Sequence, residues 1–298
     1  MAASIICVGN ATLDRIWTVE SLPRPGQKIR SHAYLEVGGG QAANAAVAAA
    51  RLGGRVNLVS AVGVDAAGEK ILEQLRAEQI DVDAVQVVAG ARSISSVILV
   101  ERGGERVVVG DVDPALYAVP PRYNLVAVER AQAVLADVKW PAQAEVVLRQ
   151  ARCAGISIVL DVEPAMAGNH DLLCPLADHA IFGQAGLAAY TCSDDASTGL
   201  QIAKQRLGCI VGVTLGARGV LMSTPDGQAL IDAPRVAVAD TTGAGDTFHG
   251  AYTLAIAEGR DALAAARFAC AAAALKCTMP GRAGMPTRGE LDLFMAGT

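Results

Sequence analysis

A short segment rich in glycine, threonine and aspartate carries the strongest chemical signal in the sequence. Residues 240–248 read DTTGAGDTF and begin an alanine-rich stretch with helical character. Glycines let successive backbone N–H groups turn toward one point, and a helix N-terminus adds its positive dipole end, so we expect an anion hole here. Asp246 follows in the first helical turn, where its carboxylate can accept the proton of an attacking hydroxyl during phosphoryl transfer. The alternative is that Asp246 only caps the helix and the glycines only form a tight turn.

Three consecutive glycines begin a second candidate site. Residues 38–46 read GGGQAANAA and are followed by an alanine-rich helical pattern that ends at residues 51–53. Because glycines have no side chains, a polar ligand can press against the main-chain N–H groups, and Asn44 can both donate to and accept from sugar hydroxyls. The alternative is that the glycines form a flexible joint.

The elements that must position these residues alternate between short apolar runs and helical stretches. This alternation predicts an α/β fold with a doubly wound, mostly parallel β-sheet flanked by helices. Residues 5–8 are predicted to be the first strand, and ligands of such sheets bind at the edge where it ends, near residues 10–14. Further strands are expected at residues 57–61, 133–136, 157–161, 179–182, 210–214 and 236–239, and further helices at residues 69–78, 142–154, 245–258 and 262–276.

Four short strands are expected outside this alternation. Two lie at residues 15–19 and 33–37, and two at residues 95–100 and 106–110, which are joined by a turn at residues 102–104. Their turn-forming neighbours and separation from the main pattern predict a small β-sheet lid laid over the core. We therefore expect one domain of residues 1–298 with lid segments at about 14–37 and 92–112.

Composition excludes several classes of function. The formal net charge of −5 offers no positive surface for a nucleic acid or an acidic membrane. The seven cysteines have wide, irregular spacings without a C-x-x-C pair, which indicates neither a zinc site nor a disulfide framework. No stretch approaches the ~20 apolar residues of a membrane span, and the first nine residues lack the basic start of a signal peptide. We expect a cytoplasmic protein with no nucleic-acid or membrane partner.

With both glycine segments in this order, the chain resembles the ribokinase (PfkB) family of carbohydrate kinases from residues 10–14 to residues 281–284. The resemblance implies a ribokinase-like fold and an ATP-dependent enzyme that phosphorylates a hydroxyl of a small sugar with the help of Mg²⁺. It also implies a role for each matching residue. The implied groups are Asp246 as general base; the amides of Gly243, Ala244 and Gly245 as anion hole; Asp14, Gly39, Gly40 and Asn44 for the sugar; Thr214, Gly216 and Gly219 for ATP; and Asp240 and Thr242 for a monovalent cation such as K⁺.

The chain departs from the family pattern at two places. Residues 183–186 read GQAG where relatives commonly have Asn-x-x-Glu, a motif that helps to organise Mg²⁺ and phosphates, and Gln41 stands where ribokinases often have lysine. In these departures the chain resembles the ketohexokinase side of the family. Residues 36–40, 135–140, 248–251 and 274–278 add a likeness to sulfofructose kinase. The branch resemblance implies a ketose or a ketose derivative as substrate.

An anionic substituent on the sugar would need converging cations. By the same branch resemblance the candidates are Lys28 in the lid and Lys139 after a core strand. Lys139 stands where the branch has an arginine, so the planar guanidinium that suits two-point binding of an anion is missing. Where the branch has a neutral amide side chain, this sequence has Gly110, next to Asp111 and Asp113, whose carboxylates would repel a substrate anion. These differences favour a neutral or differently substituted sugar over a sulfonate.

Two other functions stay open. One is a nucleoside kinase of the same family, although such sites usually stack the base on aromatic rings and few aromatics lie near the expected lid. The other is a sugar-binding regulator without catalysis, although such a protein has no use for a base such as Asp246 beside a phosphoryl site. A dinucleotide-binding protein is excluded, because no GxGxxG follows the first strand. Since relatives often pair through the lid strands, we expect a homodimer through the lid.

Overall fold

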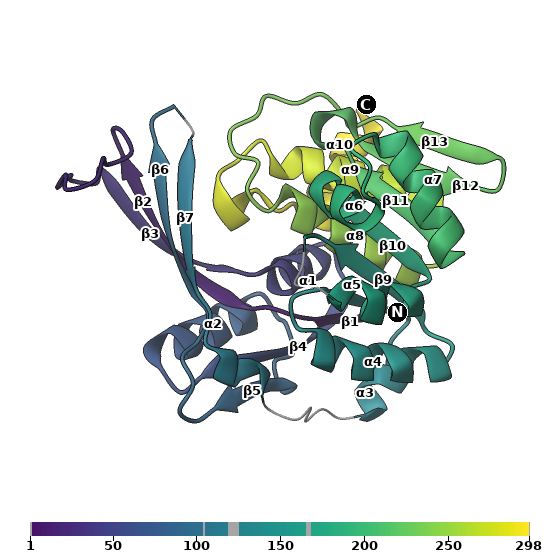
Figure 1. The fold of residues 1–298 in the computed structure, drawn as a ribbon, viewed down its shortest axis with the longest axis horizontal. Helices are drawn as coiled ribbons and strands as arrows, with labels where there is room; N and C mark the ends of the chain where they lie inside the picture. The colour runs from purple at the N-terminus through teal and green to yellow at the C-terminus, as the bar shows by residue number, and fades with distance from the viewer. Residues whose placement is uncertain (1, 104, 119–124, 165–167, 298) are drawn as a thin grey trace.

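The computed structural model describes residues 2–103, 105–118, 125–164 and 168–297 (Figure 1). Its larger sheet contains β1 (Ser4–Val8), β4 (Arg55–Gly63), β5 (Val85–Val88), β8 (Ala133–Asp137), β9 (Ser157–Val162), β10 (His179–Gly183), β11 (Ile210–Thr214), β12 (Val220–Thr224) and β13 (Gly227–Ile231). The order is β13-β12-β11-β10-β9-β8-β1-β4-β5. Pairing is parallel from β5 to β11 and antiparallel for β12 and β13. The predicted mostly parallel sheet is confirmed.

Helices cover both faces of this sheet because its strands are apolar on both sides. In β1, Ile5 and Cys7 belong to one core cluster, whereas Ile6 and Val8 belong to another. The first cluster includes side chains of α1 (Gln41–Arg51), α2 (Ala66–Ala77), α8 (Ala244–Ala257), α9 (Ala262–Lys276) and α10 (Arg288–Ala296). The second includes side chains of α3 (Leu125–Arg130), α4 (Pro141–Cys153), α5 (Asn169–Leu173), α6 (Gln184–Thr191) and α7 (Ala196–Leu207).

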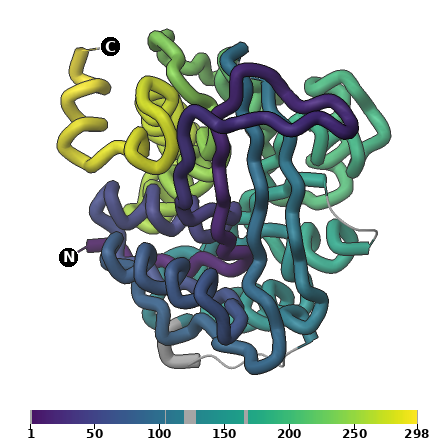
Figure 2. The backbone as a smooth tube through the Cα atoms, turned by 90° about the vertical axis from the view of Figure 1, so that its left-hand side faces the viewer, coloured from purple at the N-terminus to yellow at the C-terminus, as the bar shows by residue number. Residues whose placement is uncertain are grey.

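A second sheet stands apart from the core and forms the lid. It contains β2 (Thr12–Val19), β3 (Ala33–Gly39), β6 (Ser95–Glu101) and β7 (Arg106–Asp111) in the order β3-β2-β6-β7. The two outer pairs are antiparallel, and β2 pairs with β6 in parallel. Figure 2 shows these purple and blue strands side by side, with the core behind them. The lid thus joins two segments that lie far apart in the sequence.

Three local segments differ from the expected structure or lie partly outside the described residues. The prediction of a strand at residues 236–239 was wrong. This stretch is irregular, because the amides of Ala239 and Asp240 donate to the carbonyl oxygen of Cys277 and not to a neighbouring strand. The hairpin of β12 and β13 had not been expected. The turn at residues 102–104 falls partly on residue 104, which lies outside the described residues. Within the described part of the chain, no helix has the length and apolar character that crossing a membrane requires.

Candidate active site

Asp246 lies in the first turn of α8, which begins after Gly243. Gly243 has a φ of 76°, a left-handed conformation that glycine adopts without strain. Helices α1 and α8 pack closely because Gly250 has no side chain; a Cβ there would lie 2.2 Å from the carbonyl oxygen of Ala45. This packing brings Asn44 to α8, and its Nδ2 donates to Oδ2 of Asp246 at 2.6 Å. Among the described residues, Oδ1 of Asp246 accepts no side-chain hydrogen bond.

The surroundings of Asp246 adjust its affinity for a proton. Burial raises the pKa of Asp246 to about 7, against the lowering effects of the Asn44 hydrogen bond and the Arg282 charge, while Asp137 and Glu163 raise the pKa further. A carboxylate with a pKa near neutrality can take up a proton and release it again under ordinary conditions. The electrostatics of the site therefore suit a general base.

The turn before Asp246 exposes part of a helix N-terminus. The N–H of Ala244 donates to the carbonyl oxygen of Thr241 at 3.1 Å, so this amide already has a partner. Gly245 follows it among the first four amides of α8, which as a class have no partner within a helix. A Cβ on Gly245 would meet no atom within 4 Å, so the space around this residue is open. Open space at a helix N-terminus suits an anion such as a phosphate.

Two cavities meet at this turn. One has a volume of about 700 Å³ and lies between the lid and the core, so we call it the lid cavity. The other has a volume of about 550 Å³ and lies on the side of β11 and α9; we call it the outer cavity. Thr241 lines both. Of the predicted residues, the lid cavity is lined by Asp14, Asn44, Asp240, Thr242 and Gly243, and the outer cavity by Thr214, Gly216, Gly219, Ala244 and Gly245.

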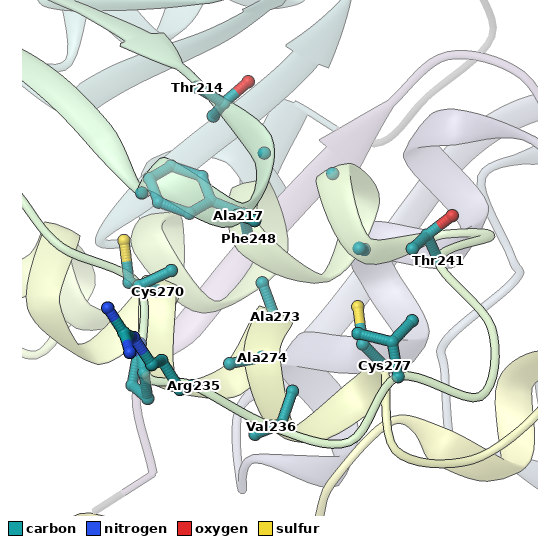
Figure 3. A pocket seen from close by; sticks show the side chains of 17 residues that line it. Thr214, Ala217, Arg235, Val236, Thr241, Phe248, Cys270, Ala273, Ala274 and Cys277 are labelled. Carbon is teal, nitrogen blue, oxygen red and sulfur yellow. The ribbon is translucent and has the colours of Figure 1, made fainter.

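The outer cavity has an apolar wall and polar ends. Figure 3 shows Phe248 of α8 and Ala273 and Ala274 of α9 around it, with Thr214 at the end of β11. Gly219 has a φ of 90°, and a Cβ there would lie 1.9 Å from a backbone oxygen of the β12–β13 hairpin, so only glycine fits. An apolar slot that ends at a helix N-terminus suits a flat base joined to phosphates.

The lid cavity presents a fixed carboxylate. Oδ1 of Asp14 accepts hydrogen bonds from the hydroxyls of Thr12, at 3.0 Å, and Ser96, at 2.7 Å. Gly39 packs against the same side chain, since a Cβ there would lie 2.1 Å from Oδ2 of Asp14. Gly40 has a φ of 91° and starts α1. Among the described residues that line the lid cavity, Gly39 and Gly40 do not appear, so they shape the backbone around Asp14 and Asn44.

Arg282 is a site residue that the sequence analysis missed. Its Nε donates to Oδ1 of Asn44 at 2.8 Å and its Nη2 to the carbonyl oxygen of Gly39 at 3.4 Å. Burial lowers the pKa of Arg282 to about 10, and the nearby Asp14 and Asp246 act against that lowering, so the guanidinium stays charged. A side chain on Gly38 would collide with this guanidinium. The position of Arg282 in a glycine-containing turn, residues 281–284, was the available signal.

Lys28 and Lys139 are not among the described residues that line the lid cavity. Lys28 is exposed in the segment between β2 and β3. Lys139 donates its ammonium to the carbonyl oxygen of Pro164. Asp111 and Asp113 form ion pairs with Arg92, at 3.2 Å and 3.6 Å, so their charges are partly balanced.

The lid reaches the glycine turn through Arg106. Its Nη1 donates to the hydroxyl of Thr242 at 2.8 Å. Thr242 is in turn fixed by Asp240, whose Oδ1 accepts from the Thr242 amide at 2.8 Å. These contacts connect β7 to the segment that begins α8.

The Glu163 carboxylate lies next to Gly183, where relatives commonly have the Asn of the Asn-x-x-Glu motif. Glu163 follows β9, and a Cβ on Gly183, at the end of β10, would lie 2.2 Å from Oε1 of Glu163. Burial raises the pKa of Glu163, and Lys139 acts in the opposite direction. Within the described residues, no group of three or more His, Cys, Asp or Glu side chains is placed to hold a metal ion alone.

Comparisons with known proteins agree with this geometry. A family model described as pfkB family carbohydrate kinase matches residues 2–288. Ribokinase of Bacillus subtilis is 32% identical over 303 residues, which cover 98% of this chain and 99% of the relative. A crystal structure from Agrobacterium tumefaciens has a TM-score of 0.95 and 34% identity, covering 100% of this chain and 98% of the other. Arabidopsis thaliana ribokinase, complexed with ribose and ATP, has a TM-score of 0.88 and 26% identity, with 99% of each chain covered.

Proposed function

Because the chain belongs to the pfkB family of carbohydrate kinases and is an ATP-dependent carbohydrate kinase, we propose that Asp246 is its general base. The observation that carries this proposal is that the lid cavity and the outer cavity meet at Thr241, in the turn that leads into α8, and that Asp246 lies in the first turn of this helix. ATP in the outer cavity directs its phosphates to this turn. A sugar in the lid cavity then places a hydroxyl between Asp246 and the γ-phosphate.

The chemical step follows from this placement. The sugar oxygen attacks the γ-phosphorus, the bond from the γ-phosphorus to the ADP oxygen breaks, and the hydroxyl proton passes to Asp246. The N-terminus of α8 at Gly243, Ala244 and Gly245 offsets charge on the transferring phosphoryl group. Asp14 accepts from a sugar hydroxyl, and the Asn44 amide, held by Arg282, orients Asp246.

Mg²⁺ fits this site through Glu163. Mg²⁺ is usually held by one or two carboxylates together with substrate phosphates and water, and it offsets phosphate charge when bound. Residues 183–186 lack the expected Asn and Glu, and the Glu163 carboxylate lies in the space next to Gly183. We propose that Glu163 and water molecules hold the ion beside the phosphates of ATP.

The proposed substrate is a small neutral sugar. Two observations support this. Lys28 and Lys139 do not line the described lid cavity, and the arginines that do, Arg106 and Arg282, already donate to Thr242 and Asn44. These engaged cations speak against a sulfonate or phosphate on the sugar. The lid strands contribute mainly aliphatic side chains to the cavity, with Tyr34 as the one aromatic ring among its described lining residues, which speaks against a base held between aromatic rings. Two neutral candidates remain: a ketose, which the branch resemblance predicts, and ribose, which the names of the curated relatives suggest.

A substrate panel separates these candidates. The purified protein is given Mg-ATP with D-ribose, D-fructose and other free ketoses, sulfofructose, fructose 1-phosphate or adenosine, and kcat/KM is measured by ADP release. We expect one neutral sugar to exceed sulfofructose and adenosine by about tenfold or more, since each missing polar partner costs roughly 1–3 kcal/mol. Preference for ribose would replace the ketose assignment. Preference for adenosine or sulfofructose would contradict the neutral-sugar proposal.

We also propose that two chains pair through the outer face of the lid. On this face Trp17 pairs with Leu99, and Val97 pairs with Val109. Exposed fractions are 40% for Val97, 45% for Val107 and 62% for Val109. An apolar sheet face of this kind is rarely left in water. The cytoplasmic location and the absence of a nucleic-acid partner likewise stay predictions.

Sedimentation equilibrium tests the pairing. We expect twice the chain mass of 30.5 kDa for the wild type and the mass of one chain for Val109→Lys, because a buried lysine charge disfavours the contact. Leu293→Lys is the matched control, because Leu293 is 78% exposed on α10, and it should stay dimeric. A monomeric wild type at micromolar concentration would exclude the dimer.

A further inference from the structure

Lys276 is a buried lysine beside the glycine turn. It is the last residue of α9, and its side chain is 0% exposed. Its Nζ donates to the backbone carbonyl oxygen of Asp240 at 3.0 Å and lies 3.4 Å from Oδ2 of the same residue. A lysine ammonium is rarely buried without a charged partner, because desolvation is costly. Asp240 is that partner, and the pair lies directly before the anion-binding turn.

Asp240 is held in its ionised form. Burial raises the pKa of Asp240, but hydrogen bonds from the amides of Gly281 and Thr242, and the charge of Lys276, outweigh burial and hold the pKa at about 2. The Gly281 amide donates to Oδ2 at 2.8 Å and the Thr242 amide to Oδ1 at 2.8 Å. The negative charge of Asp240 is therefore fully present at neutral pH and faces the Lys276 ammonium.

This arrangement does not fit the monovalent cation that the sequence predicted at Asp240 and Thr242. A potassium ion is held by oxygen atoms, typically carbonyl groups that replace its water shell. At Asp240, the backbone carbonyl oxygen and Oδ2 are such oxygens, and both already face Nζ of Lys276. A second positive charge at the same oxygens would be repelled by the ammonium.

We propose that the Lys276 ammonium takes the place of the monovalent cation, so that the kinase works without K⁺. The ammonium holds the carbonyl and carboxylate of Asp240, Asp240 holds the amide of Thr242, and this fixes the turn that leads into α8. Lys276 is thus a positioning residue for the anion hole. The activity test of this role rests on the proposed sugar phosphorylation. The effect of ions on the melting temperature can be measured without it.

The first test is the effect of K⁺ on the wild-type protein. Activity with the preferred sugar and the melting temperature are measured in KCl and in tetramethylammonium chloride at equal ionic strength. We expect both to be unchanged, with activities within about twofold, because an ion that does not bind the native state cannot stabilise it. Activation by K⁺ of about tenfold, or a higher melting temperature in K⁺ alone, would overturn the proposal. Absence of any sugar turnover would count against the proposed function, and the melting temperatures would still decide the cation question.

The second test removes the ammonium. Lys276→Ala opens space for an ion, and Lys276→Met fills the space without charge. We expect both variants to lose about tenfold or more in kcat, since each removes the only charged partner that the described residues give the partly buried Asp240 carboxylate. Only Lys276→Ala should regain activity and melting temperature with K⁺ or methylammonium. The control is Lys204→Met on α7, which removes an ammonium that donates to the carbonyl oxygen of Cys209, away from both cavities. Wild-type turnover in Lys276→Ala, with no response to K⁺, would contradict the assignment. If this variant does not fold, the wild-type measurements decide.

Discussion

Replacing Asp246 by Asn is expected to lower kcat by about 10²-fold or more, because general-base catalysis contributes 10² to 10⁴. The exchange keeps the size of the side chain and leaves an oxygen that can accept from Asn44, so folding and sugar binding should change little. Steady-state kinetics at saturating sugar and ATP give kcat, and calorimetry gives sugar affinity. Retention of more than about a tenth of wild-type kcat would exclude the base assignment.

Asp261→Asn is a matched control for this experiment. Asp261 begins α9 and accepts from the amide of Ala264 at 2.8 Å, so it is a helix-cap carboxylate outside both cavities. If Asp246 were only a cap, the two variants would lose similar amounts of stability and neither would lose turnover. We expect Asp261→Asn to keep kcat within about twofold, since a cap contributes stability and not chemistry.

Arg282→Met is expected to shift the pH dependence of the enzyme. The wild-type kcat/KM should rise with pH through about 7, because Asp246 must be deprotonated to act as a base and its pKa is about 7. The positive charge of Arg282 lowers that pKa, so its removal raises it and moves the acid limb to higher pH by about 1 to 3 units. The KM for the sugar should also rise about tenfold, because Arg282 and the Asn44 side chain that it holds both line the lid cavity. The measurement is the pH profile of kcat/KM.

Two further variants distinguish charge from shape at this position. Arg282→Lys keeps the charge without the planar fork, so we expect an acid limb near that of the wild type but a raised KM. Arg267→Met removes an exposed arginine of α9 and should change neither quantity. An acid limb in Arg282→Met that coincides with that of the wild type would mean that Arg282 does not influence Asp246.

The sequence could predict the parts of the site that are local in the chain. The glycines at residues 243–245 and Asp246 lie within four residues, and the start of α8 follows directly from them. Strand and helix alternation likewise predicted the sheet, because an apolar run with turn residues on both sides needs no distant information. The prediction of a strand at residues 236–239 failed for the opposite reason. The amides of Ala239 and Asp240 donate to the carbonyl oxygen of Cys277, which lies beyond the next two helices in the sequence.

Arg282 and Lys276 could not be placed from the sequence. Arg282 and Asn44 are 238 residues apart, and Lys276 and Asp240 are 36 residues apart. No local pattern marks such pairs, and a lysine or arginine at the end of a helix is ordinarily exposed. Lys28 and Lys139 illustrate the same difficulty, since their side-chain directions depend on tertiary packing. Long-range contacts of charged side chains are thus where the structure adds most.

Phosphorus NMR of a single reaction shows whether the protein transfers a phosphoryl group from ATP to a sugar. The protein is incubated with Mg-ATP and its preferred sugar, and the signals of ADP and of sugar phosphate are followed together. We expect equal amounts of the two products from the wild type, and neither product from Asp246→Asn. Formation of ADP without sugar phosphate, or sugar binding with no product at all, would contradict a kinase whose two cavities meet at the turn before Asp246.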